Sequence, residues 1–251
     1  MIRLWGRKSS INVQKVLWCL AELGFVEGKD FERIDAGLHF GKNRTPEFLA
    51  LNPNGLVPTL QDGDLVLWES NTILRYLVRQ YDKLKRFPVD ITSQYQSEKW
   101  MDWQLGTMWP PLRVAFLGLT RIPEADRDYA LIKSSYQEAD ALLGLLDQAL
   151  EKHVYCSGEQ FSVGDIPLAL CVSRWLLLEQ TFPDKTGPRS QLSNIDRWMR
   201  QIELETKYKV VAQKEVVEAL TKLGATVDYM GPAKSAEFIK TDAQRWQKVV
   251  D

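Results

Sequence analysis

The chain has 251 residues, of which 45% are hydrophobic and 26% charged, so it is long enough and apolar enough to bury a substantial core. Its 32 Lys and Arg residues nearly balance its 33 Asp and Glu residues, which disfavours nucleic acid and anionic membrane surfaces as partners. No apolar run approaches the ~20 residues of a membrane span, and the N-terminus lacks the pattern of a secretory leader. We therefore expect a cytoplasmic protein that acts on a small molecule.

Cysteine and histidine are sparse in this sequence. It holds three cysteines, Cys19, Cys156 and Cys171, and two histidines, His39 and His153. The cysteines are widely separated and form no CxxC pair, and neither histidine has a cysteine or carboxylate at metal-ligand spacing. The pattern favours a reducing compartment and predicts no disulfide framework, no metal and no dithiol redox motif.

Strand and helix signals alternate in the first 82 residues. Short β-prone runs, an apolar run of helical period closed by Gly24, and the hairpin signal Asp62-Gly63 define the elements. In chain order we expect a strand at 2–5, a helix at 13–23, a strand at 31–35, a linker, strands at 57–60 and 65–68, and a helix at 73–81. Ser70 and Asn71 are candidates to cap the last helix.

Strand signals almost vanish after the charged stretch at 83–90, where we place a domain boundary. Helical periods predict segments at 92–119, 129–152, 162–178 and 195–202. The first of these is expected to bend at Trp109-Pro110-Pro111, because each proline removes a backbone donor. Asp165 is expected to reach back to the amide of Ser162, as in a capping box. The pattern predicts an all-helical domain over 91–212.

Three strings in this order and spacing resemble the cytosolic glutathione transferases, in particular the serine-type bacterial members. They are SSINVQKV at 9–16, FLALNPNGLVPTL at 48–60 and DGDLVLWESNTI at 62–73, and the resemblance extends over about residues 1 to 212. It implies a thioredoxin-like α/β domain at 1–82 that binds glutathione as co-substrate, and an all-α domain at 91–212 that forms the electrophile pocket. It also implies a homodimer.

Such an enzyme must favour a thiolate, because the thiol is a poor nucleophile and free cysteine titrates near ~8.5. By the spacing of the serine-type members, Ser10 aligns with the family's thiolate-stabilising hydroxyl. Ser9 and Asn12 are rivals for this role. From the residues alone, the favoured interpretation is structural: all three would merely satisfy the N-terminus of the helix that follows.

The resemblance also implies which residues hold glutathione. Val57 and Pro58 match the loop whose proline is cis in this fold and whose valine backbone pairs with the cysteinyl part. Glu69 and Ser70 match the site of the γ-glutamyl end, where Ser70 and nearby amides take the carboxylate and Glu69 takes the ammonium. Many relatives carry a lysine at the position of Leu56. The contact to the glycyl carboxylate is therefore left to the remaining candidates: His39, Lys42 or Asn54.

The first helix of the second domain lines the electrophile pocket in this family. Here that segment offers Trp103, Trp109, Arg113 and Phe116, although each aromatic taken singly is more typical of a core residue. The resemblance predicts conjugation of glutathione to a small hydrophobic electrophile. The alternatives are a glutathione-dependent isomerase or dehalogenase, and a non-catalytic binding protein of the same fold.

Residues 213–251 extend beyond the usual end of the family. They show two amphipathic helical patterns around a short strand-like run, and they resemble the C-terminal end of the periplasmic solute-binding receptors of tripartite tricarboxylate transporters. We expect this helix-strand-helix tail to dock on the helical domain or across the dimer.

Deletion of residues 213–251 tests the docking of the tail. If the tail is docked, its removal exposes apolar surface, and the melting temperature measured by circular dichroism should fall. A melting curve identical to that of the full chain would contradict docking.

Overall fold

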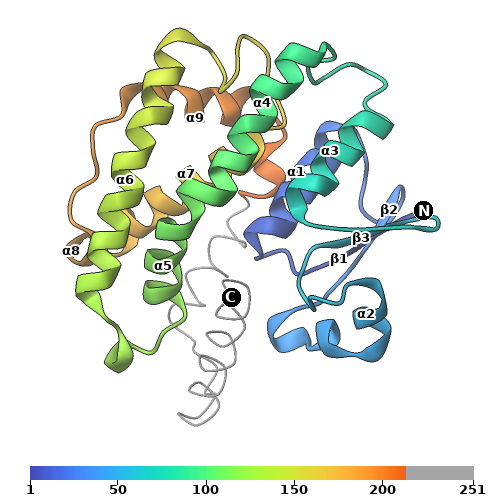
Figure 1. Cartoon of the computed structure of the whole chain (residues 1–251), viewed down its shortest axis with the longest axis horizontal. Helices are drawn as coiled ribbons and strands as arrows, with labels where there is room; N and C mark the ends of the chain where they lie inside the picture. The colour runs from blue at the N-terminus through green and yellow to red at the C-terminus, as the bar shows by residue number, and fades with distance from the viewer. Residues whose placement is uncertain (213–251) are drawn as a thin grey trace, which may run out of the picture.

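The computed structural model describes residues 1–212, and the tail at 213–251 lies outside the described residues. A four-stranded sheet with its helices forms one side of the molecule, and a set of longer helices forms the other (Figure 1). This is the expected α/β thioredoxin-like unit followed by an all-α unit. The expected helix-strand-helix arrangement of the tail, its docking and its receptor-like pattern all fall in residues 213–251, outside the described part of the chain.

The sheet has the order β2-β1-β3-β4. Strand β1 pairs in parallel with β2 and antiparallel with β3, and β3 forms a hairpin with β4. The strands and helices of this unit are β1 (Ile2–Trp5), α1 (Ile11–Glu22), β2 (Phe31–Ile34), α2 (Pro46–Leu51), β3 (Thr59–Asp62), β4 (Leu65–Trp68) and α3 (Ser70–Tyr81). The parallel pair requires a crossover, and α1 supplies it.

Helix α2 lies in the segment that we expected to be only a linker. Thr45 caps it by accepting a hydrogen bond from the Phe48 amide at 3.3 Å, and Pro46 occupies its first turn. Both are helix-start signals, but the helix is too short for its apolar period to be recognised.

Helix α1 is buried on all sides. Every residue from Val13 to Leu20 is buried, because the helix packs against α3 on one side and against α7 of the helical unit on the other. An amphipathic surface helix would expose one stripe, and this one exposes none. The two units are therefore joined through α1.

The helical unit contains six α-helices among the described residues: α4 (Ile91–Trp103), α5 (Trp109–Thr120), α6 (Tyr129–Lys152), α7 (Asp165–Thr181), α8 (Pro183–Thr186) and α9 (Ser193–Glu205). A π-helical turn at Gln104–Met108 separates α4 from α5. The break thus precedes the prolines, which lie in the first turn of α5, where a missing amide donor is tolerated.

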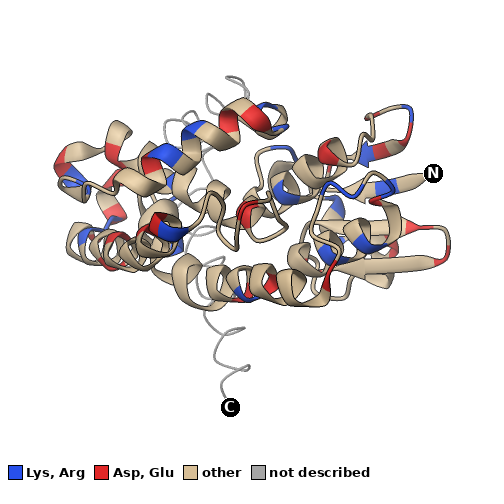
Figure 2. Ribbon diagram, turned by 90° about the horizontal axis from the view of Figure 1, so that it is seen from above, with Lys and Arg blue, Asp and Glu red and all other residues tan. Residues whose placement is uncertain are grey.

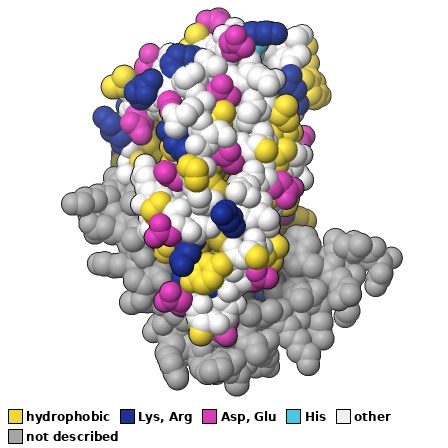
Figure 3. All heavy atoms as spheres, turned by 90° about the vertical axis from the view of Figure 1, so that its left-hand side faces the viewer, with side chains coloured by type: hydrophobic (Ala, Val, Ile, Leu, Met, Phe, Trp, Pro, Cys, Tyr) yellow, Lys and Arg dark blue, Asp and Glu magenta, His cyan; other side chains and the backbone are white. Residues whose placement is uncertain are grey.

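Charged residues of both signs are distributed along the ribbon of both units (Figure 2). On the face over α6 and α8, acidic and basic groups alternate and hydrophobic side chains form only small separate patches (Figure 3). Within residues 1–212, none of the helices has the length and apolarity needed to cross a bilayer.

Asp165 organises the start of α7. Its carboxylate accepts hydrogen bonds from the Ser162 amide at 2.9 Å and the Ser162 hydroxyl at 2.7 Å, so the expected reach back is present. It also accepts from the Cys156 amide at 2.8 Å and from Trp198 Nε1 at 3.0 Å. The Ser162 hydroxyl donates to Asp165 instead of capping the helix, which begins at Asp165 itself.

Asp165→Ala should lower the free energy of unfolding by at least about 3 kcal/mol, because it leaves several buried donors without an acceptor. Asp128→Ala is the matched control, since Asp128 caps α6 through one exposed hydrogen bond, to the Leu131 amide at 2.9 Å. Loss of such a cap costs about 1 kcal/mol. Urea unfolding of both variants measures the difference, and equal losses would contradict the role assigned to Asp165.

Candidate functional site

Ser10 stands at the N-terminus of α1 in an extended conformation, with φ −78° and ψ 123°. Its side chain is only 8% exposed and makes no capping hydrogen bond to the helix. The reading of Ser10 as a mere cap therefore lacks support. Ser9 and Asn12 are half-buried, and Asn12 Oδ1 accepts a hydrogen bond from the Ser70 hydroxyl at 3.4 Å. Asn12 is thus engaged with α3.

The loop before β3 carries Val57 and Pro58, and their peptide bond is cis, as the resemblance predicts. Asn52 anchors this loop, because its side-chain amide nitrogen donates to the Leu56 carbonyl and to the Thr59 hydroxyl, both at 3.0 Å. The Val57 backbone is fixed between these two contacts.

The junction between β4 and α3 differs from expectation in one respect. Glu69, not Ser70, is the N-cap residue of α3, and Ser70 and Asn71 lie buried inside its first turn. Glu69 is exposed and has φ 70°, a left-handed conformation that costs a non-glycine residue about 1 to 3 kcal/mol and occurs often at ligand sites. The free amides of this helix start form an anion-binding position.

Lys15 lies completely buried behind Ser70. Its ammonium donates to Ser70 Oγ at 3.4 Å, to Asn71 Oδ1 at 3.2 Å and to Gln104 Oε1 at 3.0 Å. Burial lowers the pKa of Lys15 to about 8, opposed by the negative charges of Cys171, when ionised, and Glu69. A positive charge is therefore held under the start of α3 by contacts from both units.

Sequence reasoning missed Lys15, and it also missed its neighbour Gln14. Gln14 Nε2 donates to the Val211 carbonyl at 3.4 Å, and Gln14 Oε1 accepts a hydrogen bond from the buried Arg174 of α7. The sequence signal was a pair of polar residues in the middle of an apolar helical run. Such a pair normally lies on the solvent-exposed face of an amphipathic helix, so it does not by itself indicate burial.

The candidates for the glycyl contact lie on the loops around α2. His39 and Lys42 are exposed, and the His39 ring lies 4.0 Å from the ring of Phe40. Asn54 is half-buried, and its amide donates to Asn52 Oδ1 at 3.1 Å. None of the three side chains is buried, and only Asn54 is tied to the loop of Val57, through Asn52.

The four electrophile-pocket candidates separate into two kinds. Trp103 at the end of α4, Trp109 at the start of α5 and Arg113 on α5 are half-buried. Phe116 is buried, and the Arg174 guanidinium lies 5.9 Å from its ring centre. Phe116 is thus a core residue, which is the reading that each aromatic taken alone favours.

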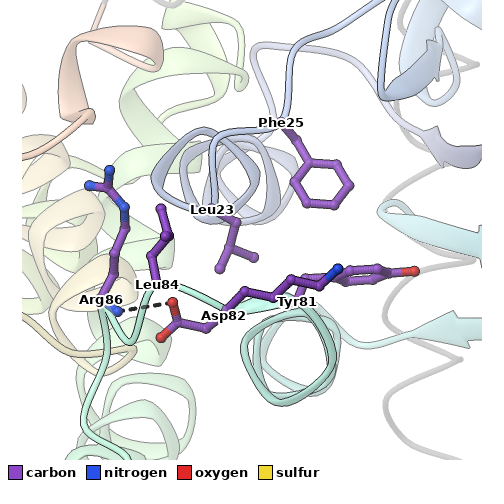
Figure 4. A pocket seen from close by; sticks show the side chains of 7 residues that line it. Leu23, Phe25, Tyr81, Asp82, Leu84 and Arg86 are labelled. Carbon is purple, nitrogen blue, oxygen red and sulfur yellow. Dashed lines mark hydrogen bonds between the residues drawn. The ribbon is translucent and has the colours of Figure 1, made fainter.

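One cavity, of about 300 Å³, lies away from these residues. It is lined by Leu23, Phe25, Tyr81, Asp82, Lys83, Leu84 and Arg86, at the C-terminal ends of α1 and α3 (Figure 4). Ser10 and Ser70 lie at the opposite ends of the same two helices. Asp82 in the cavity accepts the Arg86 amide at 2.9 Å, so it caps the chain after α3.

The three cysteines are all buried and free. Burial raises the pKa of Cys19 and of Cys156, and it raises the pKa of Cys171 to about 11 despite the nearby charge of Lys15. None is suited to be a nucleophile, since the thiolate is the reactive form. Within residues 1–212, no cluster of three or more His, Cys, Asp or Glu is placed to hold a metal ion.

The sheet order and the helical unit define a protein of the thioredoxin-like class with an appended all-α domain. Residues 1–79 match the family model for the glutathione S-transferase N-terminal domain. Glutathione S-transferase GstB of Escherichia coli K12 is 44% identical over 205 residues, which cover 80% of this chain and 93% of GstB. The chain therefore belongs to the glutathione S-transferase family, and it is an enzyme of that class.

Solved structures agree with this assignment. A theta class glutathione S-transferase from Xanthomonas axonopodis pv. citri with glutathione bound is 38% identical, with a TM-score of 0.73 and coverage of 85% of this chain and 97% of that one. A delta-class glutathione transferase from Nilaparvata lugens has a TM-score of 0.74 at 24% identity, over 90% of this chain and 99% of that one. The second likeness concerns the fold alone.

Cys19, Cys156 and Cys171 should stay unreactive in the folded protein. An aromatic disulfide reagent at about pH 8 should label none of them until guanidinium unfolds the chain, because burial keeps each thiol protonated and covered. Ala125→Cys places a thiol at an exposed position and is the positive control. Rapid labelling of the native wild type would show that a cysteine is accessible.

Proposed function

We propose that this enzyme conjugates the glutathione thiolate to a small hydrophobic electrophile and that Ser10 stabilises the thiolate, as in serine-type members of the family. In this proposal residues 1–82 bind glutathione, residues 91–212 supply the electrophile surface, and the enzyme acts as a homodimer in the cytoplasm. The observation that carries the proposal is the Ser10 hydroxyl, which stands at the N-terminus of α1 and does not cap it. A side chain that capped the helix would already be hydrogen-bonded to one of its backbone amides.

Glutathione is proposed to lie along the loop of Val57 and the start of α3. The Val57 backbone pairs with the cysteinyl part, and the amides of α3 with the Ser70 hydroxyl take the γ-glutamyl carboxylate. Lys15 supports this, because its ammonium donates a hydrogen bond to Ser70 Oγ and so keeps a positive charge under the start of α3. Glu69 is exposed beside this position and takes the ammonium of the tripeptide.

The energetic demand on Ser10 is modest. Lowering the thiol pKa by about two units corresponds to roughly 2.7 kcal/mol. A hydrogen bond to a charged group contributes about 1.5 to 3 kcal/mol, and the positive end of α1 adds to it. One hydroxyl is therefore sufficient. The thiolate sulfur then attacks the electrophilic carbon, and the leaving group departs with its bonding electron pair.

Trp103, Trp109 and Arg113 are the proposed electrophile contacts. They lie around the junction of α4 and α5, and their half-buried side chains offer flat apolar surface with one charge. Phe116, the fourth candidate, lies in the core. The isomerase, dehalogenase and binding-protein alternatives have no observation in the described residues that favours them over conjugation.

Ser10→Ala should lower kcat/KM for glutathione and a chlorodinitrobenzene by about ten-fold or more near pH 6.5, since the thiolate loses its hydrogen bond. The midpoint of the pH–rate profile should move upward by about one unit, because that hydrogen bond lowers the thiol pKa. Steady-state rates over about pH 6 to 9 measure both effects.

Ser9→Ala is the matched control and should keep the wild-type profile. If Ser10→Ala kept the wild-type rate while Ser9→Ala or Asn12→Ala lost it, the hydroxyl role would move to that residue. Absence of any rate in the wild type, with glutathione binding intact by calorimetry, would contradict the proposed conjugation.

A further inference from the structure

The ammonium of Lys15 is a buried charge that has hydrogen bonds but no counter-ion among residues 1–212. Its three N–H groups are used by three neutral acceptors, the side-chain oxygens of Ser70, Asn71 and Gln104. None of the ion pairs between described residues includes Lys15. Neutral acceptors satisfy the donors, but they leave the cost of desolvating the charge largely uncompensated. The ammonium is therefore suited to stabilise an anion that binds nearby.

The acceptors around Lys15 are held in their orientation by contacts from both units. Asn71 Nδ2 donates to the Met101 carbonyl at 2.9 Å, which directs Asn71 Oδ1 toward the ammonium. Gln104 Nε2 donates to Cys171 Sγ at 3.1 Å, which directs Gln104 Oε1 toward the ammonium in the same way. Because both amides are anchored, the charge occupies a fixed position under the start of α3.

Ser70 connects this charge to the anion-binding position at the start of α3. Its hydroxyl oxygen accepts a hydrogen bond from Lys15, and its hydroxyl donates to Asn12 Oδ1, both at 3.4 Å. These distances are long for hydrogen bonds, so little is lost when the hydroxyl turns toward a ligand. A carboxylate at the helix start would be bound by this hydroxyl and the first amides of α3, with the Lys15 ammonium behind them.

The ionisable groups around Lys15 provide little negative charge at neutral pH. Burial lowers the pKa of Lys15 to about 8, and the charges of Cys171, when ionised, and Glu69 oppose this effect. Burial raises the pKa of Cys171 to about 11, and Glu69 is exposed to solvent. Arg174 on α7 and Tyr208 after α9 are also buried in elements that pack against α1, and neither is an anion at neutral pH. Other charged side chains of α3 and α7 are engaged elsewhere: Arg75 and Arg79 with Glu98, and Asp165 with Ser162 and Trp198.

We propose that Lys15 is a positioning residue for glutathione: its charge, acting through Ser70, holds the γ-glutamyl carboxylate at the start of α3, and binding is coupled to protonation of Lys15. The inference rests on the proposed glutathione site and adds the residue that sets its affinity and pH dependence. A bound carboxylate favours the ammonium form of Lys15. Below about pH 8 the ammonium is already present and binding is at full strength. Above about pH 8 the free enzyme must take up a proton to bind, so the affinity should fall as the pH rises.

The first test measures the affinity for S-methylglutathione by isothermal titration calorimetry, because this ligand has no thiol to titrate. Lys15→Met removes the charge at similar length and should weaken binding by about ten-fold or more, since the stabilisation of a charged group is lost. Lys15→Arg keeps a positive charge that does not titrate in this range, and it should bind more tightly than Lys15→Met. Lys133→Met is the matched control, because Lys133 is an exposed lysine of α6, and it should bind as the wild type does.

The second test measures proton uptake, from the same titrations in buffers of different ionisation enthalpy. Near pH 8 the wild type should take up about half a proton more than Lys15→Met or Lys15→Arg, because a group at its pKa is half protonated. This difference should vanish near about pH 6.5, where Lys15 is protonated with and without ligand. The amino group of the tripeptide titrates in the same range but contributes equally in all three proteins. Glutaryl-S-methylcysteinylglycine, which lacks that amino group, should retain the uptake with the wild type.

Wild-type affinity in Lys15→Met, or equal proton uptake in the wild type and both Lys15 variants, would overturn the proposal. Thermal melting checks that the variants fold. If they do not, the wild type with the glutaryl ligand decides: uptake near pH 8 supports the role of Lys15, and its absence overturns it.

The proposed function and this inference fail in different ways. If the wild type binds neither S-methylglutathione nor glutathione, the proposed glutathione site is wrong and the role of Lys15 is overturned with it. Binding that depends on Lys15 and takes up a proton, without conjugation of an aryl halide, refutes the proposed reaction and supports the role of Lys15.

Discussion

The complete burial of α1 is the constraint on which the rest of the structure depends. A helix with no solvent face must find apolar partners all round, and here α3 lies on one side and α7 on the other. The two units consequently share α1 as a common buried element, and α3 adds contacts to α4, among them the hydrogen bond from Asn71 Nδ2 to the Met101 carbonyl at 2.9 Å. The N-terminus of this helix carries Ser10, so the packing of both units sets the position of the candidate catalytic hydroxyl.

Burial of α1 also leaves two polar side chains of the helix in need of hydrogen-bond partners, and residues of the helical unit supply them. Gln14 and Lys15 lie in the middle of the helix, and each is satisfied by a partner from the helical unit, Arg174 and Gln104. A buried ammonium without a carboxylate is costly, which explains why the pKa of Lys15 is lowered to about 8. The same contacts tie Ser70 to α1, so the two proposed anion positions of glutathione, the carboxylate and the thiolate, share one rigid support.

The buried groups around the N-termini of α1 and α3 that contribute to the electrostatic potential are positive. The N-termini of α1 and α3 contribute the positive ends of their dipoles, and the Lys15 ammonium contributes a whole charge under the start of α3. The proposed carboxylate and thiolate of glutathione would be stabilised by this arrangement, and a bound carboxylate would lower the cost of the buried ammonium in return. The enzyme as a whole is nearly neutral, so the positive potential is local to the junction.

Short-range sequence signals were sufficient for much of this protein. The order of strands and helices, the span of α6, the hairpin and the reach of Asp165 to Ser162 were all predictable, because period, turn residues and capping patterns act within a few neighbouring residues. Family strings also indicated Ser10, Val57, Glu69 and Ser70 as site residues. The exact start of α3, the π-helical turn before α5 and the short α2 were not predicted, since element ends depend on small local differences.

Only the tertiary structure decided which polar residues are buried and which charges meet. By itself the sequence determined the family, the class of fold and the turns that carry the candidate site. It did not reveal that Lys15 lies under Ser70 or that Phe116 is a core residue. These facts arise from contacts between segments that are far apart in the sequence, so the local hydrophobic period does not predict them. Burial and desolvation depend on the packed neighbours of a residue and not on its neighbours along the chain.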